Sequence, residues 1–342
     1  MNNKLLLVFR LDAGAGIGLG HYYRCKSLAD TFLETLRLKD ILIQCAFAVK
    51  KSTVETLGVN KFLPHHVLII DDEQDFIEKA SQYDFIIIDN YSYDRILFKQ
   101  LSDIENSKLI IIDDECNRGP LYADMVINPA DCFVQKHYQK FAPKAQFCLG
   151  HQYALIRPNF TDAAKKYLFK QRNKIVVSFG GADVNGLTVP LVSQLMKDKR
   201  LIHFEVLVIT GAAFKNTSDI ENLCQQAGFI HLHNIDNMDQ ILGQAMLAIS
   251  AAGSTVYELA SCGVPSVFAI VAKNQESFIS SNINYQWCQF IDCQQNTCIE
   301  QLLSSFYHFL ELKNLSKLSA IASHWVDGRG CHRVVSKLLD LT

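Results

Sequence analysis

A histidine stands where glycines join an expected strand to an expected helix. The segment Ile17-Gly18-Leu19-Gly20-His21 follows the apolar run 4–10 and precedes residues whose apolar positions recur every three or four. Glycines at such a turn let the backbone approach a ligand, and the first N–H groups of the helix are free to meet an anion. Because histidine titrates near neutral pH, His21 is a candidate acid or base. The alternative is an ordinary helix-start residue.

A second glycine turn follows an expected strand in the other half of the chain. Gly180 and Gly181 come after the apolar run 175–179, and are followed by Ala182 and Asp183. A glycine pair there exposes backbone N–H groups to a phosphate, although a plain tight turn has the same letters.

A third turn resembles the start of a short helix. Ala252, Gly253 and Ser254 follow the expected strand that ends at Ser250. Ser254 is a good N-cap, and the helix would point its positive end at the carboxyl edge of a sheet, where diphosphates bind. Glu258, one turn later, either accepts hydrogen bonds from a ribose diol or is an acidic residue favoured near a helix start.

Acidic residues close two expected strands of the first half. Asp89, followed by Asn90 and Tyr91, closes one, and the pair Asp113 and Asp114 closes the other. Carboxylates there order a histidine, bind sugar hydroxyls or hold a metal. Adjacent carboxylates on one strand point to opposite faces, so we expect no metal. We expect structural hydrogen bonds for Asp113 and Asp114, and a place for Tyr91 in the substrate site.

Arg157 is the candidate cation near the expected junction of the two halves. It ends the segment Tyr153-Ala154-Leu155-Ile156-Arg157. It either reaches a phosphate or is an ordinary surface arginine.

These residues need elements to position them, and short apolar runs recur at spacings that suit alternating strands and helices. Residues 167–174 are polar and basic and are the expected linker. We expect two doubly wound, Rossmann-like α/β domains facing each other across a cleft, over residues 1–165 and 174–342. The expected strands are 4–10, 41–49, 66–70, 85–89, 109–113 and 125–128, then 175–179, 204–210, 230–233, 246–250 and 266–270.

Composition narrows the class of protein. The 342 residues are 49% hydrophobic and carry a net charge of −2, which suits two domains and argues against a nucleic-acid partner. The eleven cysteines include Cys288, Cys293 and Cys298, whose spacing of five fits neither a zinc knuckle nor a redox pair, so we expect free thiols. The first apolar run is too short for a signal peptide or a membrane span, which predicts a cytoplasmic protein.

Taken in order, these segments resemble the UDP-sugar hydrolases of pseudaminic acid biosynthesis. The match covers roughly residues 4–277, and the residues beyond carry no motif that predicts a role. Tyr257 stands where many relatives have tryptophan. The matching blocks are Arg10-Leu11-Asp12 with 17–21, Arg24 and Cys25; 89–91; 112–114 with Asn117, Arg118, Ala123 and Asp124; 153–157; 180–183; and 250–255 with Glu258, Leu259, Asn274 and Gln275.

The resemblance implies a glycosyltransferase B (GT-B) fold, in which the second domain holds UDP and the first supplies the histidine. His21 falls on the catalytic histidine of the family, and Arg157, Glu258 and Asn274 fall on ligand contacts, with Gln275 beside them. The implied reaction releases UDP from a UDP-linked diacetamido-trideoxy sugar, with water as the attacking group, His21 as general base, inversion at the anomeric carbon, and no cofactor or metal. The alternatives are a GT-B glycosyltransferase that uses a UDP-sugar donor and a non-catalytic nucleotide-sugar binding protein.

Overall fold

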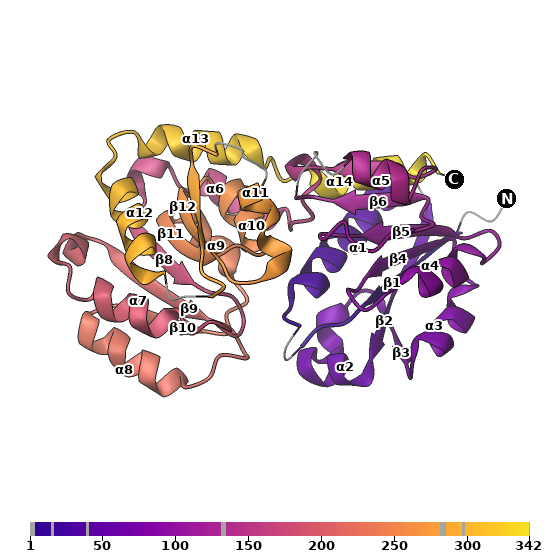
Figure 1. Cartoon of the computed structure of the whole chain (residues 1–342), viewed down its shortest axis with the longest axis horizontal. Helices are drawn as coiled ribbons and strands as arrows, with labels where there is room; N and C mark the ends of the chain where they lie inside the picture. Colours follow the sequence, from indigo (N-terminus) through magenta and orange to yellow (C-terminus); the bar gives the residue numbers. More distant parts are fainter. Residues whose placement is uncertain are drawn as a thin grey trace. The chain divides into compact units, whose positions relative to one another are not determined.

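The computed structural model describes residues 4–14, 17–38, 41–130, 135–280, 285–295 and 298–341. The chain forms two compact units. Unit 1 comprises Met1–Arg157 with Arg329–Thr342, and unit 2 comprises Pro158–Gly328. Each unit has one parallel sheet flanked by helices (Figure 1).

The sheet of unit 1 has the strand order β3-β2-β1-β4-β5-β6-β7, and every described pair in it is parallel. Every strand expected in this half is present, with ends that differ by at most one residue. The strands are β1 (Lys4–Leu11), β2 (Leu42–Lys50), β3 (His66–Ile70), β4 (Phe85–Asp89), β5 (Lys108–Ile112), β6 (Met125–Asn128) and β7 (Gln146–Leu149).

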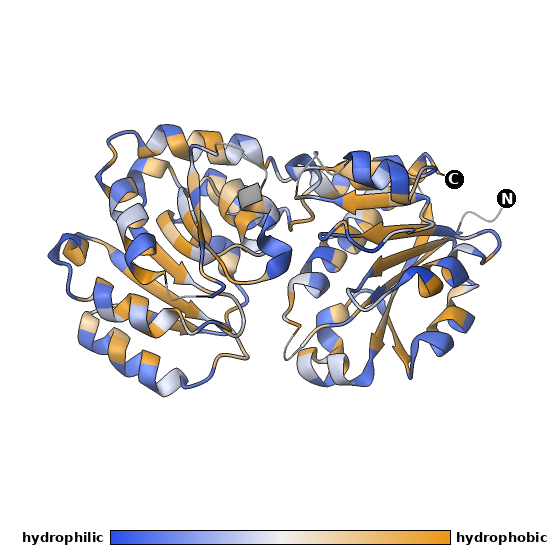
Figure 2. Cartoon of the chain, in the orientation of Figure 1, coloured by the Kyte–Doolittle hydropathy of each residue, from blue (hydrophilic) through white to orange (hydrophobic). Residues whose placement is uncertain are grey.

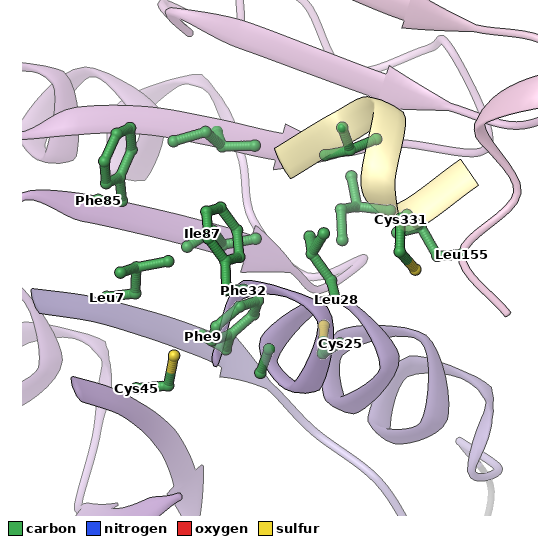
Figure 3. Packing of buried hydrophobic residues seen from close by; sticks show 14 of the residues in the cluster. Leu7, Phe9, Cys25, Leu28, Phe32, Cys45, Phe85, Ile87, Leu155 and Cys331 are labelled. Carbon is green, nitrogen blue, oxygen red and sulfur yellow. The ribbon is translucent and has the colours of Figure 1, made fainter. Parts of the chain in front are cut away.

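Both faces of this sheet are covered, because alternate residues of each strand point to opposite sides. In β1, Leu7 and Phe9 pack with Phe32 of α1, whereas Val8 packs on the other face with the helices α3 and α4 (Figure 3). The helices of unit 1 are α1 (Gly20–Arg37), α2 (Lys51–Leu57), α3 (Glu73–Ala80), α4 (Arg95–Ser102), α5 (Gln135–Phe141) and α14 (Gly330–Leu339), with the 3₁₀ turns η1 (Val59–Phe62) and η3 (His151–Tyr153).

Unit 2 has the strand order β10-β9-β8-β11-β12-β13, again parallel in each described pair. Its strands are β8 (Lys174–Ser178), β9 (Glu205–Thr210), β10 (Ile230–His233), β11 (Ala245–Ala251), β12 (Ser266–Ile270) and β13 (Cys288–Asp292). Its helices are α6 (Asn159–Lys166), α7 (Thr188–Leu195), α8 (Thr217–Ala227), α9 (Met238–Gly243), α10 (Thr255–Ser261), α11 (Ser277–Ser280), α12 (Ile299–Glu311) and α13 (Leu315–Trp325), with the 3₁₀ turns η4 (Phe169–Gln171), η5 (Lys199–His203) and η6 (Lys273–Gln275).

The structure departs from the expected domain boundaries of 1–165 and 174–342. Residues 158–165 belong to unit 2, and the last helix, α14, belongs to unit 1. The reason is packing: Val334, Val335 and Leu338 of α14 are fully buried in the core that α1 forms with the sheet. The polar segment expected to be the linker contains η4 and lies inside unit 2.

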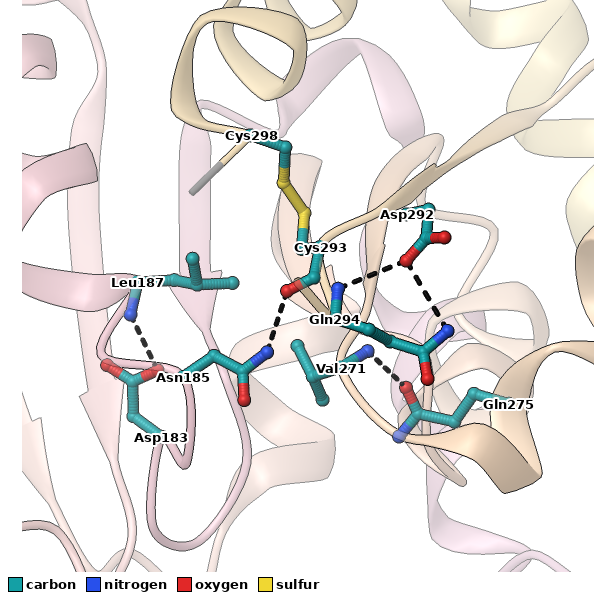
Figure 4. Close-up of a disulfide and its surroundings, with 9 residues drawn as sticks. All are labelled: Asp183, Asn185, Leu187, Val271, Gln275, Asp292, Cys293, Gln294 and Cys298. Carbon is teal, nitrogen blue, oxygen red and sulfur yellow. Dashed lines mark hydrogen bonds between the residues drawn. A yellow bond between two sulfur atoms is a disulfide. The ribbon is translucent and has the colours of Figure 1, made fainter. Parts of the chain in front are cut away.

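The expectation of free thiols is wrong for one pair. Cys293 and Cys298 form a disulfide between the end of β13 and the start of α12, with their Cα atoms 5.4 Å apart (Figure 4). Cys288, in the same series, is a buried free thiol. The two bonded cysteines are five residues apart, a spacing that corresponds to no metal or redox motif, and their Cα distance is within the range for a disulfide.

Candidate functional site

The predicted histidine lies at the carboxyl edge of the unit 1 sheet. The connection after β1 runs through α1 on one face, and the connection after β4 runs through α4 on the other. Neighbouring strands whose connections leave in opposite directions create a crevice, which is where open α/β sheets bind ligands. His21 is the second residue of α1, directly after Gly20, and Asp89 is the last residue of β4. Both therefore border this crevice.

His21 and Asp89 form a short, buried hydrogen bond. Nδ1 of His21 lies 2.6 Å from Oδ1 of Asp89, and the two side chains are 8% and 0% exposed. An ionised carboxylate only accepts hydrogen bonds, so Nδ1 carries the proton and donates it. Nε2 of the neutral ring then keeps its lone pair. This is the arrangement of an oriented general base.

Arg24, one turn after His21 on α1, holds the same carboxylate. Its Nε and Nη2 donate to the two oxygens of Asp89 at 2.6 and 2.5 Å, and its Nη1 donates to Asp114 Oδ2 at 2.7 Å. The Cys25 thiol donates to Asp89 Oδ2 at 3.4 Å. Asp89 is thus surrounded by donors on α1.

These contacts decide the charge state of the carboxylate. Burial alone would raise the pKa of Asp89, but Arg24 and His21 hold that pKa well below its ordinary value. Burial likewise opposes the charge of Arg24, but Asp114 and Asp89 raise its pKa well above the usual range. Asp89 is therefore ionised at neutral pH.

Tyr91, which the sequence predicts for the substrate site, lies against this cluster. Its ring meets the His21 ring edge to face, with the centroids 4.7 Å apart, and its hydroxyl donates to Asp114 Oδ2 at 2.7 Å. The Arg118 guanidinium lies 5.8 Å from the Tyr91 ring centroid. The side chain is 36% exposed and so is within reach of a ligand.

The two aspartates after β5 have different roles. Asp113 accepts hydrogen bonds from the Tyr138 hydroxyl at 2.8 Å and from Arg118 Nη2 at 2.8 Å, which fits the expected structural role. For Asp114 the expectation is incomplete, because it binds both Arg24 and Tyr91 and therefore belongs to the cluster around His21. Sequence reasoning missed Arg24 and Asp114 as parts of one cluster.

Arg157 ends the first segment of unit 1, and its guanidinium lies 5.0 Å from the ring centroid of Tyr23 on α1. Tyr23 follows His21 by two residues. The structure therefore places Arg157 beside the start of α1, although the sequence separates it from this helix by more than a hundred residues.

In unit 2, two of the predicted turns follow adjacent strands at a reversal of strand order. Strand β8 pairs with β11 so that Ser178 is opposite Ser250. Gly180 and Gly181, after β8, are exposed, and Gly180 has φ +78°. Gly253 and Ser254 follow β11. The structure thus places both turns at the crevice where this type of sheet binds ligands.

The third turn differs from expectation in detail. Ser254 stands at the predicted N-cap position of α10, but it has helical backbone angles and its side chain makes no capping bond. Ala252 is fully buried and its N–H donates to the Ala269 carbonyl at 2.9 Å. Glu258 is half-buried on α10.

The remaining predicted contacts lie on η6, after β12. Asn274 and Gln275 are both half-buried. The Gln275 side-chain oxygen accepts a hydrogen bond from the Val271 N–H at 2.9 Å, which fixes the turn that carries them (Figure 4). Strand β12 is next to β11, so η6 and the Gly253 turn follow neighbouring strands.

A hydrogen bond links the backbone of the disulfide-bonded Cys293 to the loop that follows Gly180 and Gly181. The carbonyl of Cys293 accepts a hydrogen bond from Asn185 Nδ2 at 2.7 Å (Figure 4). In the same loop, the Asp183 carboxylate accepts from the N–H groups of Leu187 and Thr188 at 2.9 and 2.8 Å. These bonds hold the segment between β8 and α7 in place.

Comparison with known proteins relates part of the chain to one domain family. Residues 160–285 match the glycosyltransferase family 28 C-terminal domain. Among the described helices, none is long and apolar enough to cross a membrane. No three His, Cys, Asp or Glu side chains of the described residues gather as metal ligands.

Three curated proteins are similar in sequence. The uncharacterized protein MJ1062 of Methanocaldococcus jannaschii is 27% identical over 75% of this chain and 54% of its own length. The spore coat polysaccharide biosynthesis protein SpsG of Bacillus subtilis is 22% identical over 74% of each chain. The pseudaminic acid cytidylyltransferase and UDP-2,4-diacetamido-2,4,6-trideoxy-beta-L-altropyranose hydrolase of Helicobacter pylori is 24% identical over 75% of this chain and 43% of its own length. The chain thus spans about half the length of two of these relatives.

Several solved structures superpose on almost the whole chain. MurG of Acinetobacter baumannii superposes with a TM-score of 0.66 at 13% identity, covering 98% of this chain and 99% of its own. The UDP-GlcNAc 2-epimerase of Neisseria meningitidis, solved with UDP-GlcNAc, has a TM-score of 0.65 at 10% identity, covering 98% and 100%. The expected fold class is confirmed: the chain has the GT-B fold, and its curated relatives support kinship to the expected family.

Proposed function

We propose that the protein is a hydrolase that cleaves a UDP-linked sugar at its anomeric C–O bond and releases UDP and the free sugar with inversion. The observation that carries the proposal is the His21–Asp89 pair, which leaves Nε2 of His21 as a proton acceptor at the carboxyl edge of unit 1. The named hydrolase activity of the H. pylori relative supports water as the attacking group. A UDP-linked diacetamido-trideoxy sugar, as in that relative's name, is the proposed substrate.

The proposed reaction is a single displacement. Nε2 takes a proton from a water molecule as its oxygen bonds to the anomeric carbon, the bond from that carbon to UDP breaks, and the electron pair leaves on the β-phosphate oxygen. Stabilisation of the diphosphate is assigned to Gly180, Gly181 and Gly253 of unit 2, whose backbone N–H groups suit an anion. Glu258 is assigned to the ribose diol.

Other predicted residues have narrower proposed roles. Arg157 is assigned to a phosphate, Tyr91 to the sugar, and Asn274 and Gln275 to the nucleotide sugar. Ser254, whose side chain makes no capping bond to α10, is assigned to the diphosphate.

The test is His21→Asn in the full-length protein. We expect UDP binding, measured by calorimetry, to persist, whereas UDP release without any acceptor falls about 10²- to 10⁴-fold, the usual loss when a general base is removed. The matched control is His66→Asn, an exposed histidine at the start of β3, which should leave turnover unchanged. Near-normal turnover in His21→Asn would refute the assignment.

A glycosyltransferase is the second candidate, because residues 160–285 match a glycosyltransferase domain. The same His21–Asp89 pair can deprotonate an acceptor hydroxyl in place of water. UDP release that requires an added acceptor would favour this candidate. UDP binding without turnover under either condition would indicate a non-catalytic binding protein.

A further inference from the structure

Arg24 is the residue on which both carboxylates of the His21 cluster converge. We propose that Arg24 is a positioning residue for the hydrolysis: it fixes Asp89, and through Asp89 the orientation of His21, and it fixes Asp114, and through Asp114 the Tyr91 hydroxyl. This inference rests on the proposed function. We assign Arg24 no contact with the proposed water or substrate: it acts through Asp89 and Asp114, and its Nη2 also lies 3.2 Å from Nδ1 of His21.

The contacts use the planar shape of the guanidinium. One edge, Nε and Nη2, binds the two oxygens of Asp89, and Nη1 binds Asp114. The side chain is only 13% exposed, so these bonds are largely shielded from water. Because Asp89 ends β4 and Asp114 follows β5, one arginine from α1 joins the carboxyl ends of two adjacent strands. A lysine ammonium lacks the fork that makes this geometry possible.

The contacts also form a closed circuit. His21 binds Asp89, Asp89 binds Arg24, Arg24 binds Asp114, Asp114 binds Tyr91, and the Tyr91 ring packs against the His21 ring. Arg24 is the member that joins the two carboxylates. Removing it opens the circuit, so that Asp89 and Asp114 are joined only through the ring contact between His21 and Tyr91, and the His21 ring and the Tyr91 hydroxyl are held less firmly.

Arg24 also sets the local charge. Among the described residues, the groups around the His21–Asp89 pair include Arg24 and Cys25 from α1 and Tyr91 after β4, with Asp114 after β5 bound to Arg24 and Cys331 of α14 behind Cys25. With Arg24 present, two carboxylates share one adjacent positive charge; without it, both are uncompensated and favour a protonated imidazole ring. An imidazolium has no lone pair on Nε2 and cannot act as a base.

The experiment compares Arg24→Met, Arg24→Lys and Lys26→Met in the full-length protein. Lys26 is the matched control, because it binds Asp30 on the same helix, and Asp30 pairs with another histidine, His65, at 2.7 Å. In Arg24→Met we expect kcat to fall on the order of 10²-fold with little change in KM. We also expect the acid limb of the pH–rate profile to move to higher pH, because removing a neighbouring positive charge favours the protonated ring.

The lysine variant separates charge from shape. Arg24→Lys keeps a positive charge, so the acid limb stays near its original pH, but the lysine cannot hold both carboxylates, so kcat stays low. Wild-type kcat in Arg24→Lys would overturn the positioning role. Lys26→Met should match the unaltered protein in both measurements.

A second readout does not depend on turnover. In protein labelled with ¹⁵N-histidine, the His21 signals are those missing from the His21→Asn spectrum. We expect an Nδ1-protonated ring in the unaltered protein and an imidazolium that persists to higher pH in Arg24→Met. If His21 titrates identically with and without Arg24, the inference is wrong even if the protein is a hydrolase. If no UDP-sugar is hydrolysed but the ¹⁵N result holds, the proposed function fails and the positioning role of Arg24 stands.

Discussion

Asp89 holds a full negative charge inside unit 1, and this charge makes the stability of the unit depend on pH. Its pKa in the folded protein lies below the ordinary carboxyl value of ~3.9, because Arg24 and His21 outweigh the effect of burial. A group with a lowered folded-state pKa contributes stability that is fully present above its unfolded pKa. That stability is lost as the pH falls through the folded-state pKa. The window for Asp89 therefore lies below about pH 4.

The substitution Asp89→Asn tests this dependence. We expect a loss of about 3–5 kcal/mol in the free energy of unfolding at pH 7, because Arg24 loses a buried partner. The difference from the unaltered protein should shrink progressively below about pH 4, as measured by urea denaturation at a series of pH values. Asp84→Asn, at the opposite end of β4, removes a carboxylate that binds only the Leu6 N–H among the described contacts and should cost less. A difference that stays constant down to pH 2 would contradict the role of the charge.

At this scale, sequence reasoning singled out His21 but not the residues that bind it. His21 stands out by the glycines before it, and Asp89 by its place at the end of an apolar run, where a carboxylate can order a histidine, bind a sugar or hold a metal. Their pairing across 68 positions depends on β1 lying next to β4, and the spacing of apolar runs does not reveal strand order. Asp114 was assigned a purely structural role for the same reason.

At the scale of elements, the position of the Gly180-Gly181 turn after β8 depends on Gly211, which lies in the loop after β9. A Cβ on Gly211, directly after β9, would lie 2.5 Å from the Gly181 Cα and 2.8 Å from its carbonyl oxygen. Both atoms belong to the backbone of Gly181, so a side chain at position 211 must push the two loops, after β8 and after β9, apart. The loop after β9 also donates through the Ala213 N–H to the Gly181 carbonyl at 3.1 Å. Gly211 therefore sets the position of the proposed diphosphate turn.

We expect Gly211→Ala to weaken UDP binding on the order of 10- to 100-fold, measured by titration calorimetry, because small displacements of binding groups are costly. The matched control is Gly228→Ala at the end of α8, where φ is +70° and no atom lies within 4 Å of the added Cβ. It should cost about 1 kcal/mol in stability and leave UDP binding unchanged. Equal UDP affinities in the two variants would argue against a diphosphate site at this turn.

The elements were largely predictable, except at one edge of each sheet. The apolar runs locate β1 to β6 and β8 to β12, and Figure 2 shows hydrophobic residues along the strands of both sheets. The strands that no run predicted, β7 and β13, each lie at one edge of a sheet, whereas the opposite edge strands β3 and β10 were predicted. An edge strand is covered less completely, so polar residues such as Gln146 in β7 and Gln289 in β13 interrupt its apolar pattern.

At the scale of the whole molecule, one buried arginine explains why the expected linker is not a linker. Arg172 lies in the basic segment that composition marked as a boundary, yet it is only 9% exposed. Its Nη1 donates to the Cys262 carbonyl at 2.7 Å and to the Ala245 carbonyl at 3.3 Å, and burial lowers its pKa. In the sequence, an arginine that binds carbonyl groups inside a domain cannot be distinguished from an arginine exposed in a linker. Composition alone therefore misplaces the boundary.

The order of the chain also does not reveal that its last helix, α14, returns to unit 1. Leu338 of α14 is fully buried in the core of unit 1, so Leu338→Ala should cost about 2–5 kcal/mol there. Hydrogen exchange should show lost protection in β1 and α1, with unit 2 unchanged. Leu302→Ala on α12, an equally buried leucine of unit 2, should give the reverse pattern. Lost protection in unit 2 alone after Leu338→Ala would mean that α14 stabilises the second unit, as the order of the chain suggests.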